Sequence, residues 1–251
     1  MLQPIITFSL LMAIWIFTRI FYRIEDDWIG DIRARDWGHL RSIVILNHTS
    51  LYEPLLAGIA DWRLLWLFSC HGVLPVAEKT MRRKIGVFFK FLVRHTVVVT
   101  RQRDHTWDRV LNTVDDRSIV IILPEGRMKR RDGLDSKGRP MTVRGGIADI
   151  LEAIDEGRLL LLYSGGFHHI QAPGESRFPK LFKTIRARLE LIDVADYKRQ
   201  VNEGWPDVEF RKAVVEDLTH RRDHHCPELE DPSLAPPEQH GGSASTADSR
   251  S

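Results

Sequence analysis

A histidine and a carboxylate, His48 and Glu53, lie five residues apart within residues 47–54, and together they could act as a general base and its orienting acid. A neutral imidazole accepts a proton through one ring nitrogen while its other N–H donates to a carboxylate, which stabilises the imidazolium. Side chains five residues apart on a regular helix point about 140° apart, so the two can meet only if His48 precedes the helix. Pro54 favours that arrangement, because proline prefers the first helical position and biases the residue before it away from helical dihedrals.

A second polar loop follows a similar apolar run. Residues 43–46 precede the His48 loop, and residues 119–123 precede Pro124-Glu125-Gly126-Arg127. Both runs are typical of buried strands. Loops that follow strands are common places for chemistry on a rigid scaffold. The sequence therefore predicts that the two loops assemble one site.

The order of the expected elements indicates the fold class. Apolar runs alternate with helical patterns, which predicts an α/β fold with a mixed, largely parallel sheet flanked by helices and an N-terminal membrane-associated helix. We expect strands near 41–46, 64–69, 96–100, 118–123, 159–163 and 186–194, and helices from 54 and over 79–93, 104–115, 144–155 and 207–221.

Three regions follow from this pattern. The N-terminal helix covers 1–24 and a globular domain covers 25–222. Residues 227–251 are expected to be a disordered tail, because Pro, Ser, Gly, Glu and Ala dominate them and large apolar residues are almost absent.

The N-terminal segment carries the membrane prediction. Residues 1–18 contain no charged side chain, and Arg19 and Arg23 follow them. As a helix they would be about 27 Å long, close to the hydrocarbon thickness of a bilayer. Positive charge after the apolar run, rather than before it, argues against a cleaved signal peptide and for a retained helix. We therefore expect localisation at the cytoplasmic face of the inner or plasma membrane; the alternative is a buried amphipathic helix.

The charge distribution indicates an anionic partner. Lys and Arg total 36 against 34 Asp and Glu, but residues 79–103 contain eight basic residues and no acid. Phosphate, a membrane surface and nucleic acid would all suit such a block. No nucleic-acid-binding motif or aromatic platform accompanies it, so we predict no nucleic acid partner. Cys70 and Cys226 are too few for a disulfide framework and suggest a reducing compartment.

Other motifs are weaker. His220, His224, His225 and Cys226 lack a second ligand group at a suitable spacing, so we predict no metal site. Ser164 follows an apolar run but lacks the Gly-x-Ser-x-Gly elbow of a serine hydrolase. Phosphate-binding and dinucleotide-binding glycine loops are absent from the sequence, which argues against nucleotide hydrolysis and dinucleotide chemistry.

The order and spacing of these motifs resemble the glycerolipid acyltransferase family, which includes the 1-acylglycerol-3-phosphate acyltransferases. Asn47-His48 fits the family's HX4D motif, with Glu53 in place of Asp. Pro124-Glu125-Gly126 fits its Pro-Glu-Gly-Thr-Arg motif, with Arg127 in place of Thr. The other corresponding positions are Lys79, the strand ending in Arg101, the helix start at Arg144-Gly145-Gly146 and residues 159–164, which lack the family's proline. The resemblance covers roughly residues 35–195.

The resemblance implies transfer of a fatty acyl group from acyl-CoA or acyl-carrier protein to the hydroxyl of a lysophospholipid or 1-acylglycerol-3-phosphate. His48 would be the general base and Glu53 its orienting acid. Lys79, Arg101 and Arg127 would hold an acceptor phosphate. Glu125 would contact the glycerol or the arginines, Gly126 would allow a tight turn, and Arg144 would add positive charge to the substrate site.

Under this hypothesis residues 25–222 form an acyltransferase domain with membrane lipid as partner and no cofactor beyond the donor substrate. The alternative is a noncatalytic lipid-binding membrane adaptor, in which the departures at Glu53 and Arg127 mark lost activity. A serine hydrolase is the weaker alternative.

Overall fold

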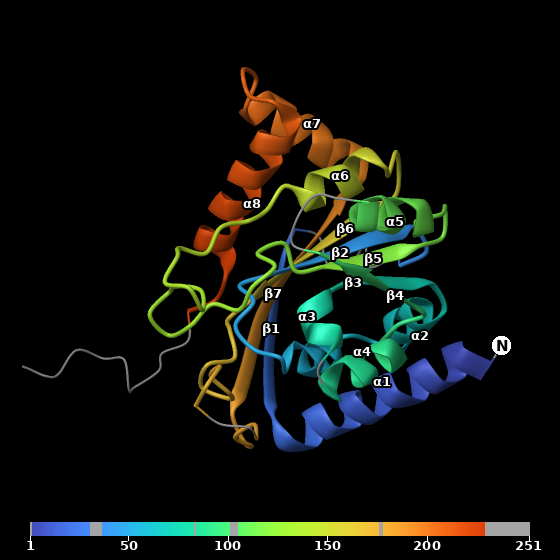
Figure 1. Ribbon diagram of the computed structural model, residues 1–251, viewed down its shortest axis with the longest axis vertical. Helices are drawn as coiled ribbons and strands as arrows, with labels where there is room; N and C mark the ends of the chain where they lie inside the picture. The colour runs from blue at the N-terminus through green and yellow to red at the C-terminus, as the bar shows by residue number, and fades with distance from the viewer. Residues whose placement is uncertain (1, 31–36, 83, 101–104, 176–177, 229–251) are drawn as a thin grey trace, which may run out of the picture.

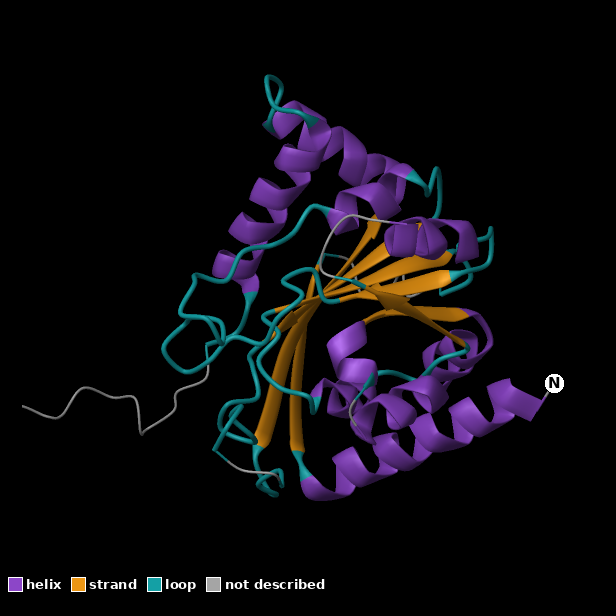
Figure 2. Cartoon of the chain, viewed as in Figure 1, coloured by secondary structure: helices purple, strands orange, loops and turns teal. Residues whose placement is uncertain are grey.

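The computed structural model describes residues 2–30, 37–82, 84–100, 105–175 and 178–228. A seven-stranded sheet runs through the molecule with helices on both faces (Figures 1 and 2). The only antiparallel pair in the described sheet is β6 with β7, which confirms the predicted mixed, largely parallel α/β fold. The strand order is β1 (Arg23–Ile29), β7 (Thr184–Asp193), β6 (Arg158–Ser164), β2 (Leu40–Leu46), β5 (Ile119–Ile122), β3 (Gly72–Ala77) and β4 (His95–Val99).

Each face of the sheet has its own apolar core, because successive side chains of a strand point to opposite faces. Ile43 and Ile45 of β2 belong to one core, and Val44 and Leu46 belong to the other. The first core is covered by α1 (Leu2–Phe21), the 3₁₀ helix η2 (Glu53–Ile59), α2 (Trp62–His71), α3 (Glu78–Met81) and α4 (Lys84–Leu92). The second is covered by α5 (His105–Thr113), α6 (Gly146–Glu152), α7 (Val194–Gly204) and α8 (Phe210–His225).

The expected strand at 64–69 is wrong, because this segment belongs to α2. The carboxylate of Asp61 accepts a hydrogen bond from the N–H of Leu64 at 2.8 Å and caps the helix. Leu64, Leu65 and Phe68 form its buried face, which fits helical periodicity. The strand of this region is β3, which starts directly after the helix.

Three other differences concern helix 79–93, β1 and α7. In place of the single helix expected over 79–93, the structure has two shorter helices, α3 and α4. β1 carries no apolar run: it is an edge strand that pairs in parallel with β7, and Arg186 lies 2.7 Å from Glu25 and Arg188 lies 3.3 Å from Asp27 across the pair. The helix α7 has few apolar residues, and Asp193 caps it by accepting from the N–H of Ala195 and Asp196.

The N-terminal helix α1 lies along the helical layer of the first core. Trp15 donates its indole N–H to the carbonyl of Ala60 at 2.9 Å. Gly58 allows Thr18 to approach η2, since a Cβ at position 58 would lie 2.6 Å from the Thr18 methyl carbon. Within the described part of the chain, α1 is the one helix with the length and apolar composition to cross a membrane, which suggests membrane association. Large apolar side chains are exposed along it, at Leu2, Ile5, Ile6, Ile16, Phe17 and Ile20.

Candidate active site

The loop of residues 47–50 follows β2, near the middle of the sheet. Asn47 has a φ of +66°, a left-handed conformation that asparagine adopts more readily than most residues. Its side-chain amide donates to the carbonyl of Ser164, at the end of β6, at 2.9 Å. Neighbouring parallel strands thus hold the loop where β2 ends.

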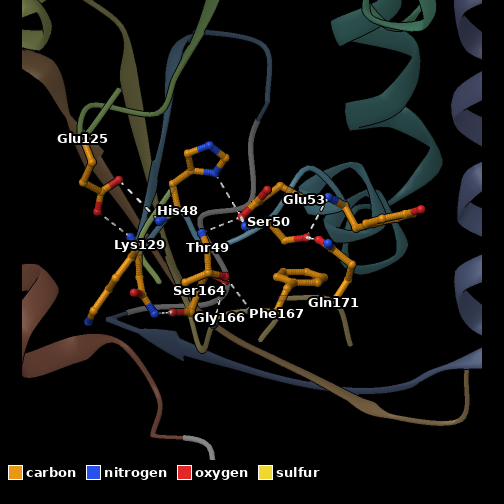
Figure 3. Close-up of polar contacts among 12 residues, drawn as sticks. His48, Thr49, Ser50, Glu53, Glu125, Lys129, Ser164, Gly166, Phe167 and Gln171 are labelled. Atoms are coloured by element: carbon orange, nitrogen blue, oxygen red, sulfur yellow. Dashed lines mark hydrogen bonds and ion pairs between the residues drawn. The ribbon is translucent and has the colours of Figure 1, made fainter. Parts of the chain in front are cut away.

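Two carboxylates receive the four successive backbone N–H groups of this loop (Figure 3). Glu125 accepts from Asn47 at 2.8 Å and, more weakly, from His48 at 3.4 Å. Glu53 accepts from Thr49 and Ser50, each at 2.9 Å. Because hydrogen bonds to an ionised acceptor are stronger than neutral ones, the two acids fix the backbone that carries the imidazole.

Glu53 also approaches the imidazole itself. Its Oε1 lies 3.0 Å from Nδ1 of His48. Glu53 itself lies in the first turn of the 3₁₀ helix η2, directly before Pro54. Nδ1 makes no hydrogen bond of good geometry to any described residue, so the two groups are in close electrostatic contact, which becomes an ion pair when the ring is protonated. The other ring nitrogen is turned away from Glu53 (Figure 3).

The surroundings of His48 act on its pKa in opposite directions. Burial lowers the pKa, while the nearby charge of Glu53 and the charge of Glu125 raise it, and the net pKa of His48 is raised. Glu125 is itself only 2% exposed, and burial raises its pKa against the opposing effect of the Asn47 N–H. The imidazole is therefore more basic than an isolated one.

His48 and Glu53 line one part of a cavity of about 640 Å³. Gly126 and Arg144 line it as well, and most of the remaining wall is aliphatic or aromatic. That apolar wall comes from the inner strands and from α1, η2, α2 and α4, and includes Leu11, Ile45, Leu56, Leu65, Phe68, Val76, Leu92 and Leu162. His48 and Arg144 thus adjoin an apolar space that suits an alkyl chain.

Gly126 and Arg144 lie together at this cavity. Gly126 has a φ of +62°, which a residue without Cβ adopts at no steric cost. A Cβ there would lie 3.4 Å from Cδ of Arg144. The predicted proximity of the 124–127 loop to the His48 loop is present, although Glu125 contacts the loop backbone rather than an arginine.

Other predicted residues lie elsewhere or outside the described part. Arg127 forms an ion pair with Asp135, whose side chain is 1% exposed and also lies 3.1 Å from Arg139. Lys79 lies in α3, but its side chain is not among those described, and Arg101 falls outside the described residues. Their roles as phosphate ligands stay predictions.

Arg211 lines the cavity and was not predicted from the sequence. It lies in the first turn of α8 and pairs with Asp149 of α6. Gly145 makes room for it, because a Cβ there would lie 2.5 Å from Nε of Arg211. The glycine pair at 145–146 was the only sequence signal for this approach, since Arg211 is distant in the chain.

Ser164 does not suit the serine hydrolase alternative. It is fully buried, and its hydroxyl oxygen accepts from the N–H of Gly166 at 3.0 Å. A nucleophilic serine needs an exposed hydroxyl beside a base. Among the described residues, no group of three or more His, Cys, Asp or Glu side chains is arranged to hold a metal ion.

Comparison with solved structures shows a fold similarity. The chain resembles the crystal structure of the 1-acyl-sn-glycerophosphate (LPA) acyltransferase, PlsC, from Thermotoga maritima, with a TM-score of 0.51. The sequences are 15% identical, and the similarity covers 87% of this chain and 81% of that one. No family model matches the chain, and no curated protein matches it. The structural likeness is therefore one of fold.

Proposed function

We propose that the protein is an acyltransferase that moves a fatty acyl group from a thioester to a hydroxyl of a glycerolipid. The observation that carries the proposal is the 3.0 Å contact between His48 and Glu53 at a largely apolar cavity of about 640 Å³. The fold shared with the Thermotoga maritima acyltransferase supports it.

The chemistry proceeds by direct transfer. Nε2 of His48 accepts the proton of the acceptor hydroxyl as its oxygen attacks the thioester carbonyl. The tetrahedral intermediate collapses, the C–S bond breaks, and the imidazolium returns the proton to the leaving thiolate. Glu53 holds the ring and stabilises its charged form, and such general-base help contributes about 10²–10⁴-fold.

The cavity walls suit the two substrates. The apolar lining takes the fatty acyl chain, while Arg144 and Arg211, the latter paired with Asp149, bring guanidinium groups to the same cavity as His48. We propose a lysophospholipid or 1-acylglycerol-3-phosphate as acceptor, with Lys79 and Arg101 as further phosphate ligands. Arg127 supports the loop through Asp135. The donor is acyl-CoA or acyl-carrier protein.

We also propose that α1 holds the enzyme at the cytoplasmic face of the inner or plasma membrane. Its exposed apolar residues support a lipid contact, and lipid is where an acceptor of this class resides. The adaptor alternative is favoured less, because it gives no chemical role to the contact of His48 with Glu53 at the cavity, and perturbed pKa values of this kind cluster at functional sites.

The test is an assay of the purified full-length protein with a panel of lysolipids and two donors, acyl-CoA and acyl-carrier protein. Products are identified by mass. A diacylated product formed from one of these pairs supports the proposal, and absence of product with the whole panel favours the adaptor.

A further inference from the structure

A second cavity, of about 410 Å³, adjoins the same loop. Asn47 and Thr49 line it, whereas His48 and Ser50 line the apolar cavity, and the two cavities share no lining residue. Alternate residues of the 47–50 loop thus form a partition between two spaces of different chemistry.

The second cavity is lined by basic side chains, and two of them have fixed positions. Arg131 lies 2.8 Å from Glu175 and donates to the carbonyl of His168 at 3.0 Å. Arg222 lies 2.8 Å from Asp223 and donates to the carbonyl of Met141 at 3.1 Å. These contacts hold two guanidinium groups beside the cavity. Among the described residues, its lining has four Lys or Arg residues, Lys129, Arg130, Arg131 and Arg222, against two acidic ones, Asp223 and Glu228.

Lys129 and Arg130 line the cavity too, and within the described residues their side chains have no ion pair. The backbone that carries Lys129 is held in place: its N–H donates to the carbonyl of His48 at 2.8 Å, and its carbonyl lies 2.6 Å from Nε2 of His168. Lys129 as a residue is half-buried. A cationic side chain on a fixed backbone, with no carboxylate paired to it, carries charge that an anion would balance.

An unpaired acceptor lies in the same wall. The side-chain oxygen of Asn47 is buried and has no hydrogen-bond partner, although its amide nitrogen is bonded to Ser164. A ligand for this cavity therefore offers both negative charge and a donor. A monoprotonated phosphate monoester has both, since it carries acceptor oxygens and one O–H, and its second pKa is about 6.

We propose that this cavity is a binding site for a phosphate monoester, separate from the place where the acceptor hydroxyl reacts. Three ligands offer this chemistry: inorganic phosphate, which has the same acceptor oxygens and O–H without the ester bond, and two monoesters, the ribose 3′-phosphate of a CoA-type donor and a glycerol phosphate. The CoA-type donor and the glycerol phosphate rest on the proposed function, whereas binding of inorganic phosphate does not. A bound phosphate would contact the face of the 47–50 loop opposite to the imidazole.

Isothermal titration calorimetry on the full-length protein at low salt tests the site without turnover. The ligands are inorganic phosphate, CoA against dephospho-CoA, and glycerol 3-phosphate against glycerol. We expect the phosphorylated member of at least one pair, or inorganic phosphate, to bind, and the member that binds most tightly identifies the source.

Lys129→Gln should weaken that binding about tenfold or more, because a charge-assisted hydrogen bond is lost. Arg130→Gln, at an exposed position, gives a second reading if Lys129→Gln disturbs folding. Lys137→Gln is the matched control, as it is exposed in the same loop and does not line the cavity.

The proposal is overturned if no phosphorylated ligand binds, or if binding in both Lys129→Gln and Arg130→Gln equals that of Lys137→Gln. Its outcome is separate from that of the proposed function. Phosphate binding that persists in a protein without acyl transfer supports the site and contradicts the enzymatic assignment. Acyl transfer by a protein that binds none of these phosphate ligands supports the enzymatic assignment and contradicts the site.

Discussion

The carboxylate of Glu125 accepts the backbone N–H of Asn47 at 2.8 Å, across 78 residues of chain. The bond joins the loop after β5 to the loop after β2 and holds Asn47 in its left-handed conformation. Glu53 accepts the N–H groups of Thr49 and Ser50, so the position of His48 depends on two buried acids rather than on the local chain alone.

Glu125→Gln tests this positioning role. A carboxamide keeps the size of the side chain but loses the charge that strengthens two hydrogen bonds, so we expect kcat to fall about tenfold or more while KM changes little. Steady-state kinetics with the best substrate pair measure the split. Glu152→Gln, at an exposed position of α6, is the control. A change in KM with unaltered kcat would instead indicate that Glu125 contacts the acceptor.

Glu53→Gln should shift the pH dependence of the reaction. The charge of Glu53 raises the pKa of His48, and the unprotonated ring is the active form. In the wild type the acid limb of kcat/KM should lie above the ordinary histidine value of about 6.5. Without the charge the pKa of His48 falls, so the limb should move to lower pH while the maximal rate decreases. Profiles that superimpose would show that Glu53 does not act on the imidazole.

The acids and the imidazole illustrate what the sequence can and cannot predict. His48 and Glu53 are close in the chain, and Pro54 marks the helix start, so their meeting follows from local geometry. The contact of Glu125 with Asn47 joins distant residues through a backbone N–H, which carries no residue-type signal. Sequence reasoning therefore found Glu125 but gave it different partners.

The fold likewise has elements that the local sequence predicts and elements that it does not. The strands β2, β5 and β6 are buried on both faces and appear in the sequence as apolar runs. The helix α2 was mistaken for a strand because its apolar run is short, and a short run does not distinguish the two. β1 was missed because it lies at the edge of the sheet, where its half-exposed strand carries charged residues in place of an apolar run.

Arg127→Ala should affect stability more than substrate binding. The change leaves the buried Asp135 with Arg139 as its remaining cationic partner, so we expect a loss of about 1–3 kcal/mol in the free energy of unfolding. Urea denaturation measures it, with Arg199→Ala on the exposed face of α7 as the control. A large rise in KM for a phosphorylated acceptor, with stability unchanged, would place Arg127 on the substrate instead.

Leu65→Trp should change which acyl chains are used. Leu65 is a buried part of the apolar cavity wall, and a larger side chain there removes space for methylenes. Each buried methylene contributes about 0.8 kcal/mol, so we expect preference to move toward shorter donors. Competition between donors of different length measures the ratio, and thermal unfolding of the variant checks that its fold is kept. An unchanged ratio in a folded variant would show that the acyl chain lies elsewhere.

The most direct test of the account is acyl transfer by His48→Ala. The variant removes the proposed base, so turnover should fall about 10²–10⁴-fold while circular dichroism and membrane association stay those of the wild type. His39→Ala, which alters an exposed histidine just before β2, should retain full activity. Turnover by His48→Ala close to that of His39→Ala would contradict the proposed mechanism.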